Sequence, residues 1–196
     1  MFREICSVNF LWYHSYKFTF PVLHEEKSLK KDFAWAATSW VSEIQRNYLL
    51  LSAFKSIITS MNQNKEKGNE HFKAAVSSGA ETRDDEYREA LSYYKTSLKV
   101  AKQKQSDDEI SKMMSNDRTF YTLNYDYLKI TVILNSNSAM AHLKLEKWDQ
   151  AVCAALRGRR ELSKLKKLIN DDEEFKKDFG TLKEKIEYRM IEARKN

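Results

Sequence analysis

Apolar side chains recur every three or four residues over much of the chain beyond residue 30. Between residues 32 and 60 they form one stripe, which consists of Phe33, Ala37, Trp40, Ile44, Tyr48, Leu51, Phe54 and Ile58. Side chains at this spacing share one face of an α-helix, so the stripe predicts one or two helices that bury it. The alternative, a helix lying on a membrane surface, is disfavoured because its polar face carries charges of both signs.

Two later pairs of segments repeat the same pattern. They occupy 64–72 with 86–98, and 136–145 with 147–156. Each segment carries a small residue at a matching position: Gly68 and Ala90 in the first pair, Ala139 and Ala151 in the second. Small residues allow two helices to approach where they cross. We therefore predict an all-α fold of antiparallel helical hairpins, with Gly68 against Ala90 and Ala139 against Ala151.

The first 31 residues do not follow this pattern. They are aromatic-rich and interrupted by charges, and they lack the apolar core and cleavage site of a secretory signal. An extended segment, a strand-like tail and a weak mitochondrial leader remain open, although Glu4, Glu25 and Glu26 weigh against the leader. No stretch approaches the roughly 20 apolar residues of a membrane span. The predicted organisation is an irregular segment (1–31), a helix or helices packed on the repeats (32–61), and a helical repeat domain (62–196).

Composition agrees with helices. The chain has one proline and four glycines, too few turn-forming residues for a protein of many short strands. Its formal net charge of +6 comes from 34 Lys and Arg against 28 Asp and Glu, with the two signs interspersed. This pattern favours a solvated surface over a basic face for an acidic partner. Nucleic acid is disfavoured because no recognition motif accompanies the basic residues.

The candidate chemistry is sparse. Cys6 and Cys153 are far apart, as expected for unpaired thiols in a reducing cytoplasm. Cys153 falls at an apolar repeat position, which predicts a small buried side chain. The four histidines (His14, His24, His71, His142) show no metal-ligand spacing, and His71 and His142 occupy equivalent, packing positions of the two pairs. No phosphate-binding loop or nucleophile motif is present. We therefore expect no metal, no cofactor and no enzymatic activity.

The segments KEKGNEHF (65–72) and NSAMAHLKL (137–145) resemble the tetratricopeptide repeats (TPRs) of chaperone-binding proteins, and the second is especially similar to those of FK506-binding immunophilins. The resemblance covers 64–160 and returns at 183–194. It implies an α-solenoid that acts as a non-catalytic, cytoplasmic co-chaperone or adaptor. The implied partners are the acidic C-terminal tails of the 90- and 70-kilodalton heat-shock chaperones.

The same resemblance implies five clamp residues for the carboxylates of such a tail. Lys65 and Asn69 match a Lys-x-x-x-Asn motif, Asn137 matches the asparagine of the second repeat, and Lys185 and Arg189 match Lys-x-x-x-Arg. Residues four apart lie on one helix face. Lysine, arginine and asparagine side chains are suitable donors for a terminal carboxylate next to an aspartate side chain.

The repeat spacing leaves alternatives open. Gly68 and Ala139 are 71 residues apart, against about 34 for adjacent repeats, and we expect helical extensions plus a loop in 104–130. A further insertion, 157–181, precedes Lys185 and Arg189. If a longer helix does not absorb it, these two residues are displaced from the clamp positions that the resemblance implies. The alternatives are a TPR scaffold that binds another protein segment without a clamp, and a truncated immunophilin-like chain that lacks its isomerase domain.

Overall fold

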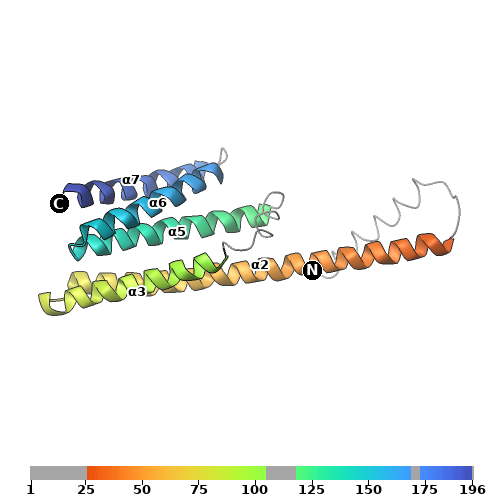
Figure 1. Cartoon of the computed structure of the whole chain (residues 1–196), viewed down its shortest axis with the longest axis horizontal. Helices are drawn as coiled ribbons and strands as arrows, with labels where there is room; N and C mark the ends of the chain where they lie inside the picture. The colour runs from red at the N-terminus through yellow and green to blue at the C-terminus, as the bar shows by residue number, and fades with distance from the viewer. Residues whose placement is uncertain (1–25, 105–117, 169–172, 196) are drawn as a thin grey trace. The chain divides into compact units, whose positions relative to one another are not determined.

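The computed structural model describes residues 26–104, 118–168 and 173–195, which form five α-helices and no strand (Figure 1). The helices are α2 (Glu26–Ser77), α3 (Ala80–Lys104), α5 (Arg118–Lys144), α6 (Trp148–Leu168) and α7 (Glu173–Lys195). The all-α class predicted from the sequence is confirmed for these residues. The glycines inside these helices are Gly68, Gly158 and Gly180, and none of the helices contains proline, the strongest helix breaker.

Helix α2 crosses two boundaries that were predicted from the sequence. It begins at Glu26, inside the segment 1–31 that we expected to be irregular, and it passes without a break through the boundary expected between 61 and 62. No glycine or proline occurs between Pro21 and Gly68, so nothing in the sequence ends the helix there. Residues 1–25 lie outside the described part of the chain.

The chain divides into two compact units, Met1–Asn47 and Tyr48–Asn196, and the side chains that are described as buried belong to the second. Among the stripe members whose burial is described, only Phe54 and Ile58 are buried, and the Phe54 ring centroid lies 5.8 Å from that of Tyr127. Earlier members of the stripe, Trp40, Ile44 and Tyr48, are exposed. The helical period therefore predicted the helix correctly. It overstated the burial of the stripe, because a helix face is buried only where another helix covers it.

Helices α2 and α3 pack along each other in opposite directions. The Ser97 hydroxyl donates to the Met61 carbonyl at 2.9 Å near one end, and His71 contacts the Glu86 carboxylate at 2.7 Å near the other. Along this contact the residue numbers rise in α2 and fall in α3, so the two helices are antiparallel. Only Ser78 and Gly79 separate the two helices.

A short turn joins α5 to α6. The Lys147 N–H donates to the His142 carbonyl at 2.9 Å and the Glu146 N–H donates to the Leu143 carbonyl at 3.1 Å. Glu146 has a φ of 57°, the left-handed conformation that commonly ends a helix in this hydrogen-bond pattern. The chain therefore reverses within three residues, and α6 starts at Trp148.

The small residues of the second pair meet different partners from those predicted. Ala139 clusters with Ala154 and Ala155 of α6 and with Met190 of α7, while Ala151 is buried outside that cluster. We predicted that Ala139 meets Ala151. The α6 residues of its cluster, Ala154 and Ala155, lie one helical turn after Ala151. Which residues of two helices meet depends on the crossing angle, which sequence spacing does not specify.

Helix α7 packs against both α5 and α6. A Cβ atom on Gly158 would lie 3.2 Å from Cδ1 of Ile186, so α6 and α7 approach closely there. At the other end of the contact, Asp178 of α7 forms an ion pair with Lys129 and lies 3.4 Å from the Tyr125 hydroxyl. The helices α3, α5, α6 and α7 have 25, 27, 21 and 23 residues, so any two of them together are longer than a 34-residue repeat.

Candidate peptide-binding site

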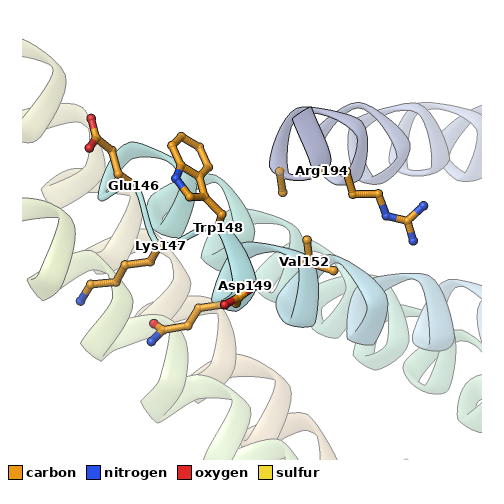
Figure 2. Close-up of a pocket in the computed structure, with 8 residues that line it drawn as sticks. Glu146, Lys147, Trp148, Asp149, Val152 and Arg194 are labelled. Carbon is orange, nitrogen blue, oxygen red and sulfur yellow. The ribbon is translucent and has the colours of Figure 1, made fainter. Parts of the chain in front are cut away.

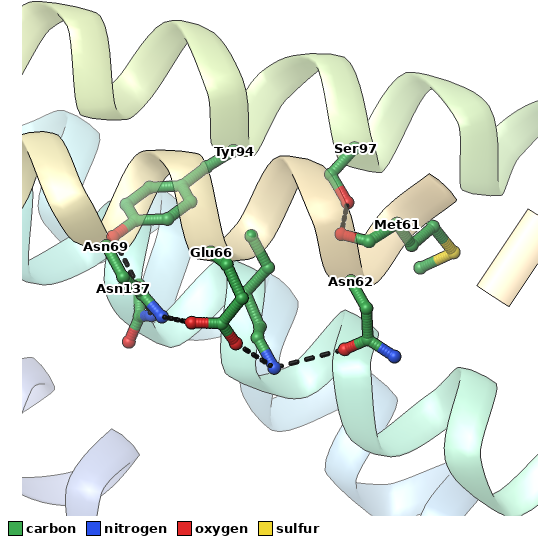
Figure 3. A network of polar contacts seen from close by, with 8 residues as sticks. Met61, Asn62, Glu66, Asn69, Tyr94, Ser97 and Asn137 are labelled. Atoms are coloured by element: carbon green, nitrogen blue, oxygen red, sulfur yellow. Dashed lines mark hydrogen bonds and ion pairs between the residues drawn. The ribbon is translucent and has the colours of Figure 1, made fainter. Parts of the chain in front are cut away.

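Two of the five predicted clamp residues are in direct contact. The Asn137 side-chain Nδ2 of α5 donates to Oδ1 of Asn69 on α2 at 3.0 Å, although the two residues are 68 positions apart. The same Oδ1 accepts a hydrogen bond from the Tyr94 hydroxyl of α3 at 2.9 Å. We call these three residues the Asn69 network (Figure 3). It connects three helices through one amide oxygen.

Gly68 provides the space for this arrangement. A Cβ atom at this position would lie 2.4 Å from Cε1 of Tyr94 and 2.7 Å from its Cδ1, too close for any side chain to fit without displacing the ring. The pairing predicted for Gly68 was with Ala90, whereas the structure places the Tyr94 ring closest to it. The missing side chain lets the Tyr94 ring lie against α2, so that its hydroxyl reaches the next residue, Asn69.

Lys65 lies one turn before Asn69 and contacts two neighbours. Its Nζ donates to Oδ1 of Asn62 at 3.1 Å and lies 3.0 Å from Oε1 of Glu66. The other oxygen of Glu66 accepts a hydrogen bond from Nδ2 of Asn69 at 3.2 Å. One carboxylate of the protein itself therefore contacts two predicted clamp donors (Figure 3).

The charge state of Glu66 follows from these contacts. The hydrogen bond from Lys65, followed by that from Asn69, lowers the pKa of the Glu66 carboxyl below its usual value. The Glu66 side chain is nevertheless 61% exposed, whereas that of Lys65 is only 17% exposed. An exposed carboxylate can leave these donors at little cost, so the site is compatible with a second carboxylate taking its place.

Arg189 of α7 is the third predicted clamp residue that reaches this region. Its guanidinium donates to the hydroxyl of Ser136, the residue before Asn137. Burial lowers the pKa of the half-buried Arg189 guanidinium, and the nearby Tyr94 opposes that effect. Among the residues that the structure describes, no carboxylate lies within ion-pair distance of Arg189. A half-buried arginine without a carboxylate partner among the described residues is unusual, because buried charges are normally paired.

Lys185 does not join the others. It lies one turn before Arg189 on α7, but it is exposed and makes no hydrogen bond or ion pair to the described residues. The structure thus connects Lys65, Asn69 and Asn137 through side-chain contacts, places Arg189 next to them through Ser136, and leaves Lys185 in solvent.

Sequence reasoning missed three residues of this region. Tyr94, Ser136 and Glu66 were not predicted from the sequence to take part in a site. Ser136 and Glu66 are sequence neighbours of predicted clamp residues, which was an available signal. Tyr94 carried no such signal, because its contact with Asn69 spans 25 positions of sequence.

The other candidate groups, His71, His142 and Cys153, differ in their surroundings. His71 stacks on Tyr93 with ring centroids 5.3 Å apart and contacts Glu86. His142 is buried, and burial lowers its pKa to about 4. Cys153 is an exposed free thiol, contrary to the expectation that it would be buried. Within the described ranges no group of His, Cys, Asp and Glu side chains could hold a metal ion, and none of the helices searched is long and apolar enough to cross a membrane.

An open hollow lies elsewhere, beside the turn between α5 and α6 (Figure 2). Its lining residues are Glu146, Lys147, Trp148, Asp149, Gln150, Val152, Ala193 and Arg194. Charges of both signs surround it without converging on one point. It shares no residue with the Asn69 network and offers no selective chemistry.

Comparison with known proteins provides no relative: no family model, no curated protein and no solved structure matches the chain. The function of the chain is therefore inferred from its own residues and contacts.

Proposed function

We propose that residues 62–196 form a TPR-like α-solenoid of helical hairpins that binds an acidic C-terminal peptide. The chain would act in the cytoplasm as a non-catalytic co-chaperone or adaptor. The proposed partners are the C-terminal tails of the 90- and 70-kilodalton heat-shock chaperones. This proposal combines the resemblance of the sequence with the contacts around Asn69.

The observation that carries the proposal is the state of Arg189. A half-buried guanidinium has lost part of its hydration, and among the described residues its one hydrogen-bond partner is a neutral hydroxyl. A ligand carboxylate would supply the missing charge, and a charge-assisted bond to arginine is roughly twice as strong as a neutral one. The Asn69 network lies next to this cation and supplies amide donors.

The second anion of the ligand would replace Glu66. Lys65 and the Nδ2 of Asn69 already bind a carboxylate in the free protein, at 3.0 Å and 3.2 Å. A peptide that ends in aspartate presents two carboxylates close together. One would pair with Arg189 while the other displaces Glu66 from Lys65 and Asn69.

The test is a titration of the full chain with an acidic pentapeptide that ends in aspartate. We expect the free-carboxylate peptide to bind more tightly than its C-terminally amidated form, and its affinity to fall as NaCl is raised, because partly exposed charges are screened. Arg189→Ala should cost about 2 kcal/mol or more, since it removes the partner of a shielded carboxylate. Lys65→Ala should weaken binding in the same direction.

Matched controls come from the same helices. Lys55→Ala on α2 and Arg194→Ala on α7 remove one positive charge each without touching the network, and should leave binding unchanged apart from a small electrostatic effect. Equal binding of the free and amidated peptides would exclude the carboxylate-binding proposal.

A second candidate is a TPR scaffold that binds another protein segment without a clamp. Two observations favour it: Lys185 is exposed and uninvolved, and Lys65 is already paired with Glu66. In that case Lys65→Ala and Arg189→Ala would affect the acidic peptide no more than their controls.

A further inference from the structure

We propose that Tyr94 is a positioning residue of the peptide site: its hydroxyl fixes the side-chain amide of Asn69 so that the NH₂ group faces the ligand carboxylate. This inference rests on the proposed function and extends it to a residue on α3, a helix that contributes none of the predicted clamp residues. The Asn69 amide can point in either of two ways, and the asparagine by itself does not determine which.

The orientation of an asparagine amide decides which groups it can bind. An asparagine side chain has one oxygen that accepts and one NH₂ that donates, and a rotation of the amide exchanges them. A carboxylate accepts hydrogen bonds only, so Asn69 can bind one only with its Nδ2 side. The binding site therefore needs a device that holds Oδ1 away from the ligand.

Two donors provide that device. The Tyr94 hydroxyl donates to Oδ1 of Asn69 at 2.9 Å, and Nδ2 of Asn137 donates to the same oxygen at 3.0 Å. Both lone pairs of Oδ1 are then occupied. The Nδ2 group is left to donate on the other side, where it contacts the Glu66 carboxylate at 3.2 Å in the free protein.

Asn137 alone would define the arrangement less well. It is itself an amide and can reverse its donor and acceptor in concert with Asn69, which would turn the Asn69 oxygen toward the ligand. The Tyr94 hydroxyl is held by a ring that is 1% exposed and lies against Gly68. Burial raises the pKa of Tyr94 to about 12, so the hydroxyl keeps its proton near neutral pH and stays a donor.

The test removes only the hydroxyl. Tyr94→Phe keeps the buried ring, and we expect the affinity for a free-carboxylate pentapeptide ending in aspartate to fall about three- to tenfold, the typical effect of one hydrogen bond. Affinity for the amidated peptide should change less, so the ratio between the two peptides should fall. A merely structural role would leave that ratio unchanged.

Tyr127→Phe is the matched control. Its hydroxyl also makes a buried 2.9 Å hydrogen bond, to the Ala101 carbonyl, and Tyr127 lies ten residues before Asn137 on α5, about 15 Å along the helix axis. We expect Tyr127→Phe to lower the free energy of unfolding in urea about as much as Tyr94→Phe does. Its ratio of affinities for the free and the amidated peptide should stay that of the wild type. The side-chain NH₂ resonances of Asn69 in NMR spectra should shift in Tyr94→Phe and not in Tyr127→Phe.

The possible failures are distinct. If the wild type prefers the free carboxylate and Tyr94→Phe shows the same preference, the positioning role is wrong while the proposed function stands. If Tyr94→Phe and Tyr127→Phe lower the ratio equally, the effect is general loss of structure and the inference is again wrong. If the wild type itself does not discriminate between the peptides, the proposed function fails, and the positioning role fails with it.

Discussion

Individual residues of this protein acquire their roles from neighbours that are remote in sequence. Arg189 would be an ordinary surface arginine if α5 did not cover it, and Asn69 would be an ordinary helix asparagine without Tyr94 and Asn137. Covering by neighbouring helices strengthens the interactions of such a site, because charges and dipoles interact more strongly once water is removed from them.

His142 gives a prediction at the same scale. It is 6% exposed, and its Nδ1 has no hydrogen-bond partner among the described residues. Lys95 of α3, Lys147 of the turn and Arg157 of α6 act on it with positive charge. Burial, followed by these cations, lowers its pKa to about 4, below the usual 6.5. The unfolded chain therefore takes up a proton first as the pH falls.

The consequence is a loss of stability between about pH 6.5 and pH 4, the window between the unfolded and folded pKa values. Between pH 7 and pH 5 the loss should be about 2 kcal/mol at most, since one pKa unit corresponds to about 1.4 kcal/mol. His142→Leu should remove this part of the pH dependence, measured by urea unfolding at both pH values. Parallel curves for wild type and variant would contradict the assignment.

At the scale of elements, the helices are placed by small residues at close approaches. Gly68 contacts the Tyr94 ring, and Gly158 approaches Ile186, whereas a Cβ on Gly180 would meet nothing within 4 Å. Glycine normally weakens a helix relative to alanine. The first two glycines are therefore kept for packing, and the third has no packing reason in the described structure.

Gly68→Ala and Gly180→Ala should have opposite effects on stability. The new Cβ at position 68 would lie 2.4 Å from Tyr94 Cε1, so the buried ring must move, and overpacking of this kind typically costs about 1–3 kcal/mol. The change at position 180 should stabilise the protein by about 0.5–1 kcal/mol through helix propensity. Thermal or urea unfolding measures both. A stabilised Gly68→Ala variant would show that the ring adapts at no cost.

At the scale of the whole molecule, the described core belongs to one part of the chain. Buried apolar side chains begin at Phe54, and of residues 38–53 none whose burial is described is buried. Folding stability should therefore come from the unit Tyr48–Asn196.

A fragment of residues 48–196 should fold by itself. We expect its free energy of unfolding to agree with that of the full chain to within about 1 kcal/mol, since a compact unit with its own core is able to fold alone. Its circular dichroism should be helical, and its affinity for the acidic peptide should equal that of the full chain. An unfolded fragment, or one with much lower stability, would show that the first 47 residues contribute to the core.

The local features of the protein follow from its sequence alone. The apolar period predicted the helices, the scarcity of glycine and proline excluded a strand-rich fold, and the motifs around Asn69 and Asn137 selected two residues that contact each other. These features depend on neighbours within one or two helical turns, where the backbone geometry relates spacing to position.

The tertiary structure decided everything that depends on how helices meet. It brought Tyr94 to Asn69, placed Arg189 beside a neutral hydroxyl, left Lys185 and Trp40 in solvent, and paired Ala139 with Ala154 and Ala155. Crossing angles and long connections set these contacts. They arise from the packing of whole surfaces, so the spacing of residues along the chain does not specify them.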